Sequence, residues 1–121
     1  MKNSSASRKA NEVLRGKIAN ILLFHVSDPR LQMITVTGVE VSGDKSVANI
    51  YISADEKRYD SVERGLEAAK GHIRSILASE LDWRITPELR FHIDKSVDEA
   101  QRIARALEDE SKWQQSISNQ Q

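Results

Sequence analysis

The chain has 121 residues, close to the usual size of one domain, and its 39% hydrophobic and 30% charged composition is that of a folded globular protein. It contains no cysteine, which excludes a disulfide framework and thiolate zinc sites. No apolar run has the length of a membrane span and the polar N-terminus lacks the apolar stretch of a secretory signal, so we expect a cytoplasmic protein.

The formal net charge is zero, with 18 basic and 18 acidic residues, which at first disfavours a nucleic-acid partner. Residues 1–30, however, carry six basic and two acidic residues, a net charge of +4. Local potential governs binding to polyanions more than total charge does. A solvated charged helix explains the same count, and both interpretations stay open at this point.

Residues 1–7 are expected to form a flexible polar start, followed by a helix from Arg8 to about Val26. Its apolar residues recur at helical spacing: Val13, Leu14, Ile18, Ile21 and Leu22. The helix is expected to end at residues 27–30, because the residue before Pro29 is pushed out of the helical region.

A β-hairpin is predicted over residues 33–53. Ile34 and Val36 alternate with polar residues before Gly38, and Val39 and Val41 take up the alternation one residue out of phase after it. A phase change of one residue at a glycine indicates a β-bulge. Residues 42–45, Ser-Gly-Asp-Lys, supply the turn, and the second strand spans residues 47–53.

The second half of the chain is expected to form two short helices, 59–69 and 72–82, joined at Ala69-Lys70-Gly71, then a connector and a strand over residues 88–94. The pattern S-x-x-E at Ser96–Glu99 predicts the start of a final helix whose apolar residues suit docking on the body. Residues 111–121 are expected to be a polar tail. The prediction is therefore one α+β domain over residues 8–110, with helices on one face of a three-stranded sheet.

Catalytic and metal-binding patterns are not found in the sequence. His25, His72 and His92 lie in three separate elements, and no phosphate-binding loop or HExxH motif occurs. We therefore expect no enzyme, no metal and no cofactor. Trp83, next to Arg84, is either a base-stacking residue or, more commonly for such a residue, a cover on one end of the core.

The junction between the two short helices is the one candidate site. Gly71 is expected to end the first helix with a φ that other residues resist, leaving unpaired N–H groups at the start of the second. Lys70 and Arg74 flank these donors, and a helix N-terminus beside two cations is suited to bind phosphate. A plain helix kink with basic surface residues is an equally good interpretation.

Four motifs stand in order along the chain: DPRL at 28–31, TVTGVEVS at 35–42, GHIR at 71–74, and TPEL at 86–89 followed by Phe91 and Asp94. Together they resemble the ribosome-binding factor A family, from about residue 8 to residue 108. The resemblance implies a type-II KH-like domain of order α-β-β-α-α-β, followed by a C-terminal helix. In that family an Ala-x-Gly interhelical kink, here Ala69-Lys70-Gly71, replaces the GXXG loop with which KH domains hold nucleic acid.

The resemblance also implies a non-catalytic function. Members of this family bind the free 30S subunit and assist late maturation and 5′-end processing of 16S rRNA, above all in the cold. The implied partners are therefore 16S rRNA, the 30S subunit and other assembly factors, including a GTPase. The short tail here departs from the longer charged tail of other members. We expect a monomer.

The hypothesis for RNA binding is one phosphate-binding surface on the helical side of the sheet. It comprises Arg8, Lys9, Arg15, Lys17, Lys70, Gly71, His72, Arg74 and Arg84. Neutralising about five phosphates would make log K fall with log salt at a slope of about −4. The alternatives are a protein-interaction adaptor and another KH-like module that binds DNA.

Overall fold

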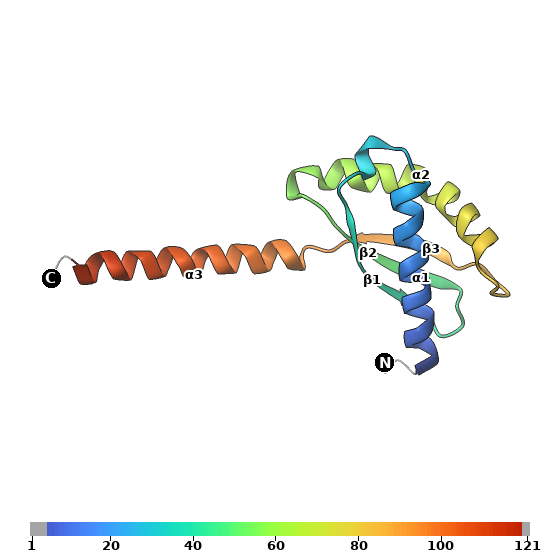
Figure 1. The fold of residues 1–121 in the computed structure, drawn as a ribbon, viewed down its shortest axis with the longest axis horizontal. Helices are drawn as coiled ribbons and strands as arrows, with labels where there is room; N and C mark the ends of the chain where they lie inside the picture. The colour runs from blue at the N-terminus through green and yellow to red at the C-terminus, as the bar shows by residue number, and fades with distance from the viewer. Residues whose placement is uncertain (1–4, 120–121) are drawn as a thin grey trace.

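A computed structural model of the chain describes residues 5–119. The helices and strands are, in order, α1 (Ser5–Phe24), β1 (Thr35–Val41), β2 (Val47–Ser53), α2 (Tyr59–Glu80), β3 (Glu88–Ile93) and α3 (Ser96–Asn119). Short 3₁₀ turns at Pro29–Leu31 and Glu56–Arg58 precede β1 and α2. The predicted α+β class is confirmed, because the described residues form three strands and three α-helices (Figure 1).

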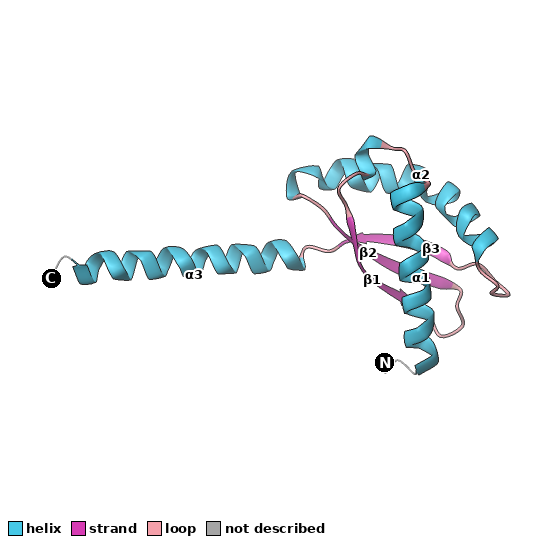
Figure 2. Ribbon diagram, viewed as in Figure 1, coloured by secondary structure: helices cyan, strands magenta, loops and turns pink. Residues whose placement is uncertain are grey.

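The three strands form one sheet in the order β1-β2-β3, shown as neighbouring magenta arrows in Figure 2. β1 and β2 are antiparallel, whereas β2 and β3 are parallel and joined through α2. Along β2, buried residues alternate with partly exposed ones, so only one face of the sheet is covered. That face packs on α1 and α2 through a single core that includes Ile18, Ile50 and Leu77.

The DPRL segment connects α1 to β1 and packs against α2. Asp28 accepts hydrogen bonds from the Arg30 backbone N–H at 2.9 Å and from its guanidinium at 2.7 Å, which lowers the pKa of Asp28. Leu31 is buried against Gly65 of α2. The Arg58 guanidinium donates to the carbonyls of Arg30 and Gln32, at 3.2 and 2.5 Å.

The predicted bulge is confirmed, because the register of β1 against β2 shifts between Val36 and Gly38. The extra residue, Thr37, donates its hydroxyl to Asp94 Oδ2 at 2.7 Å. Asp94 also accepts from the Ser96 backbone N–H at 2.9 Å and from its hydroxyl, and these bonds lower its pKa. Asp94, and not the expected Ser96, therefore caps the start of α3.

The turn between β1 and β2 lies where it was predicted, and its own side chains hold it. Asp44 Oδ1 accepts from the hydroxyls of Ser46 and Ser42, at 2.7 and 2.8 Å, and from the Ser46 backbone N–H at 3.1 Å. These bonds lower the pKa of Asp44 to about 2. The left-handed residue of the turn is Lys45, with φ 61°, whereas no glycine of the described chain has positive φ.

The prediction of two short helices over residues 59–82 is wrong, since α2 is one helix from Tyr59 to Glu80. Gly71 lies inside it with an ordinary negative φ, so it neither ends a helix nor begins one. The ribbon of α2 changes direction between its green and yellow parts in Figure 1, without an interruption of the helix.

The predicted docking of the final helix on the body is also wrong. α3 projects away from the rest of the molecule (Figure 1), and its Ile103 and Leu107 are 62% and 61% exposed. An ion pair between Arg102 and Glu56 joins its first turns to the body. α3 runs to Asn119, through residues expected to be a tail, and α1 begins at Ser5 within the expected flexible start, of which residues 1–4 lie outside the described chain.

Candidate nucleic-acid interface

The phosphate site expected at residues 69–74 does not exist in the form predicted. Because α2 is continuous there, the N–H groups of Gly71, His72 and Ile73 belong to a helix interior and are not free donors. The His72 ring lies 3.3 Å from the backbone carbonyl of His25, which follows α1, so this contact joins α2 to the end of the first helix.

Arg74 is also occupied within the fold. Its guanidinium donates to the backbone carbonyls of Pro87, at 3.1 Å, and Thr86, at 2.8 Å. These bonds tie the second half of α2 to the connector that leads into β3. The geometry gives Arg74 a structural role and leaves RNA contact by this residue a prediction.

Lys70, one of the predicted cations, lines a groove at the surface. The groove runs between α2 and β3, has a volume of about 640 Å³, and is lined by Glu63, Leu66, Glu67, Lys70, Arg90, Phe91, His92, Ile93 and Lys95. β3 is an edge strand, so the groove follows an unpaired edge of the sheet. Leu66 forms its buried floor, while Lys70, Arg90 and Lys95 place three cations along it.

The cations of the groove are held by weak, exposed partners. Lys70 pairs with Glu67 at 3.1 Å and Arg90 with Glu88 at 3.2 Å, and both carboxylates are more than half exposed. The Lys95 ammonium lies 5.6 Å from the centre of the Tyr59 ring. Ion pairs of this kind contribute about 0–1 kcal/mol, so a phosphate can replace the carboxylate partners at small cost.

The basic residues of α1 lie elsewhere. Arg8 and Arg15 line a small hollow beside Thr37, Gly38 and Val39 of β1, at the sheet edge opposite to the groove. Arg15 is 3.7 Å from Glu12, Lys9 is exposed and Lys17 is half-buried. Arg8 and Arg15 therefore lie at the opposite sheet edge from Lys70 and share no pocket with it, while RNA contact by the basic residues of α1 stays a prediction.

Arg84 is exposed next to Trp83, in the connector between α2 and β3. Trp83 packs against the core, and the Lys45 ammonium lies 4.9 Å from the centre of its ring. This arrangement supports the interpretation of Trp83 as a cover on one end of the core.

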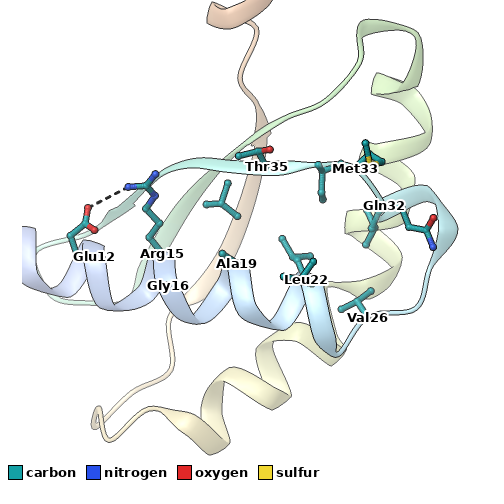
Figure 3. Close-up of a pocket in the computed structure, with 13 residues that line it drawn as sticks. Glu12, Arg15, Gly16, Ala19, Leu22, Val26, Gln32, Met33 and Thr35 are labelled. Carbon is teal, nitrogen blue, oxygen red and sulfur yellow. Dashed lines mark ion pairs between the residues drawn. The ribbon is translucent and has the colours of Figure 1, made fainter.

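A larger hollow, of about 730 Å³, lies between α1 and the start of β1 (Figure 3). Its lining is mainly apolar, with Leu22, Val26 and Met33 among the side chains drawn, and its charged pair, Glu12 and Arg15, stands at one end. Such a surface does not attract a polyanion. Among the described residues no group of three or more His, Asp or Glu side chains is placed to hold a metal ion.

The comparisons with known proteins all point to the same family. The family model described as ribosome-binding factor A matches residues 6–107. A relative from Methylobacillus flagellatus, named ribosome-binding factor A, is 40% identical over 110 residues, which are 90% of this chain and 87% of the relative. The chain belongs to the ribosome-binding factor A family.

Solved structures of the family share the fold. The crystal structure of ribosome-binding factor A from Thermus thermophilus superposes with a TM-score of 0.68 at 27% identity, over 74% of this chain and 97% of that one. A homology model of the Thermus thermophilus protein, fitted into the cryo-EM map of a 30S–RbfA complex, matches with a TM-score of 0.58 at 27% identity, over 70% of this chain and 91% of that one.

Several motif residues of this family member have structural roles here. The DPRL segment forms the 3₁₀ turn that packs against α2, and the glycine of TVTGVEVS lies at the bulge. The backbone carbonyls of Thr86 and Pro87 accept hydrogen bonds from the Arg74 guanidinium. Of the groove cations, Lys70 was expected from the sequence, whereas Arg90 and Lys95 were missed. Arg90 lies between the inward Leu89 and Phe91, so strand alternation could have shown that its side chain points outward. That Arg90 and Lys70 line the same groove could not be predicted without knowing how α2 packs.

Proposed function

We propose that this protein is a non-catalytic assembly factor that binds the free 30S subunit and assists late maturation and 5′-end processing of 16S rRNA. The observation that carries the proposal is the groove between α2 and β3, where Lys70, Arg90 and Lys95 line an unpaired sheet edge. Membership of the family, and the fit of a relative into a 30S complex, support a ribosomal partner. RNA would be held through its backbone more than through its bases.

We assign a KH-like fold to the chain through the family resemblance, and in this assignment the groove would be its nucleic-acid site. In this assignment Ala69-Lys70-Gly71 would be the family's Ala-x-Gly kink, and it would account for the change of direction between the green and yellow parts of α2 in Figure 1. Gly71 would permit the bend without ending the helix, so that Lys70 faces the groove.

The basic residues of α1 form a second contact in this proposal. Arg8, Lys9, Arg15 and Lys17 of α1, together with Arg84, would meet rRNA that the groove does not reach. A 30S particle is large enough to touch both edges of the sheet at once, whereas a short oligonucleotide in the groove is not.

The proposal extends to the cellular setting. The protein would act as a monomer in the cytoplasm, and other assembly factors, including a GTPase, would control its release. Deletion of the protein would slow growth most in the cold, when rRNA leaves misfolded states most slowly. Growth of a deletion strain at low and high temperature tests this part.

Sucrose-gradient fractionation of cell extract tests the central claim. The wild-type chain should travel with free 30S subunits and not with 70S ribosomes. A Lys70→Gln, Lys95→Gln variant should move to the top of the gradient, while the control Lys57→Gln, in the 3₁₀ turn Glu56–Arg58 outside the groove, should sediment like wild type. Wild-type sedimentation of the double variant would refute the role of the groove.

The second candidate is a protein-interaction adaptor, favoured by the apolar pocket between α1 and β1 (Figure 3). The exposed Leu23 and Met33 are among the residues that line this pocket. Filter binding of the purified chain to small-subunit rRNA fragments separates the two candidates, because an adaptor would retain no RNA. Equal retention of duplex DNA would favour a DNA-binding module instead.

A further inference from the structure

The uncovered face of the sheet carries a pair of stacked rings. Tyr51 of β2 and His92 of β3 are direct partners in the parallel register, and both lie out of phase with the buried Ile50, Ile52 and Leu89. Their ring centroids are 5.2 Å apart with an interplanar angle of 28°. The pair therefore forms a small aromatic stack on neighbouring strands of the face that the helices leave open.

The His92 ring is fixed by a second contact. Its Nε2 lies 2.8 Å from Asn49 Oδ1, within hydrogen-bond distance. With one edge bonded to Asn49 and one face against Tyr51, the imidazole has little rotational freedom to lose on binding a ligand.

His92 also lines the groove between α2 and β3, and its side chain is exposed. Since Tyr51 occupies one face of the imidazole, a ligand in the groove meets the opposite face. Lys70, Arg90 and Lys95 line the same groove. The stack and the cations are thus parts of one continuous surface.

We propose that His92 is a base-stacking residue for single-stranded RNA. A nucleobase would stack on the free face of the imidazole and extend the Tyr51–His92 pair to three rings, while neighbouring phosphates contact Lys70, Arg90 and Lys95. The proposal rests on the proposed function of the groove and adds the class of RNA it accepts. Bases inside a duplex have no exposed face, so the site selects unpaired nucleotides.

The chemistry of the surface favours this occupant. A flat π surface bordered by cations is the combination with which proteins hold single strands without reading their sequence. Glu63 and Glu67 also line the groove and repel an acidic peptide and an RNA backbone alike, but only the RNA strand brings a base that gains from the stack. Arg90 is 53% exposed and its partner Glu88 61%, so the guanidinium can exchange that carboxylate for a phosphate.

Fluorescence anisotropy with three labelled RNAs of equal length tests the proposal. The probes are single-stranded oligoadenylate, the same ribose-phosphate chain without bases, and a duplex. The full-length proteins are wild type, His92→Ala, His92→Phe, and the control His25→Ala, which removes an exposed histidine outside the groove. Circular dichroism melting verifies that each variant is folded.

His92→Ala should weaken oligoadenylate binding roughly tenfold and leave binding of the abasic chain unchanged, because only the stacked base is lost. His92→Phe should retain most of the wild-type affinity, and His25→Ala all of it. Equal loss on the abasic chain, or no loss on oligoadenylate, overturns the stacking role.

The two proposals fail in different ways. If Lys70→Gln, Lys95→Gln weakens all three RNAs while His92→Ala has no effect, the groove binds RNA and the stack does not. If neither the lysine variant nor His92→Ala changes the binding of oligoadenylate, the groove itself is not the RNA site, and stacking on His92 is overturned with it.

Discussion

Among the glycines of the described chain, Gly65 is the one at which an added Cβ would meet its neighbours most closely. A Cβ at this position would lie 2.9 Å from Leu31 Cδ2 and 3.1 Å from Arg30 Cβ, so the DPRL turn would have to move off α2. We expect Gly65→Ala to lower the free energy of unfolding by about 1–3 kcal/mol, the usual cost of overpacking. Urea denaturation measures this change.

Gly71→Ala is the matched control, since Gly71 lies in the same helix and a Cβ added there would meet no atom of another element within 4 Å. Alanine is the better helix former, so this variant should be more stable than wild type by about 0.5–1 kcal/mol. A loss of stability at Gly71 would mean that the bend of α2 needs glycine.

Asp44, at the tip of the hairpin, makes the free energy of unfolding depend on pH in the acidic range. Its pKa in the folded state is about 2, below the ordinary value of 3.8, because the Ser46 and Ser42 groups stabilise the carboxylate. Its contribution is therefore complete above pH 3.8 and is lost as the pH falls through about 2. Asp44→Asn should destabilise the protein at neutral pH, and the difference from wild type should shrink toward about pH 2. A difference in urea midpoint that is constant with pH would contradict this.

Elements with a strong local pattern could be predicted from the sequence. The alternation on either side of Gly38 placed both the hairpin and the bulge, and the helical spacing of Leu14, Ile18 and Ile21 placed the buried face of α1. The break predicted in α2 was wrong because one glycine costs a helix only about 1 kcal/mol, which the burial of Leu66, Ile73 and Leu77 on both sides easily offsets.

Arg74 joins two elements, and its role can be separated from its charge. Arg74→Lys keeps the positive charge but loses the fork that donates to Pro87 and Thr86. We expect it to lower the free energy of unfolding by about 1 kcal/mol, as loss of such hydrogen bonds does, while leaving RNA affinity unchanged. Arg105→Lys, on the exposed part of α3, should change neither property. Unchanged stability together with weaker RNA binding in Arg74→Lys would make Arg74 an RNA contact.

Whole-molecule arrangement is what the sequence could not supply. Counting basic residues predicted one surface, but the sheet order places Arg8 and Arg15 beside β1 and Lys70 beside β3, with β2 between them. Arg90 and His92 were overlooked as site residues, because they line a groove only when β3 is the edge strand next to α2. The direction of α3 was equally unpredictable, since an amphipathic helix does not specify which surface covers it.

Two groups of cations at opposite edges should respond differently to ligands of different size. For short single-stranded RNA, three groove contacts predict a slope of log K against log salt of about −2, instead of the slope of about −4 expected for one joined surface. Arg8→Gln, Arg15→Gln should leave this slope unchanged and weaken binding to 30S subunits, because only the larger particle spans both edges. Lys70→Gln, Lys95→Gln should reduce both. The opposite result would be a slope of about −4 for the short RNA that becomes less steep in the α1 variant. It would show that a single strand reaches both edges and that the two groups act as one site.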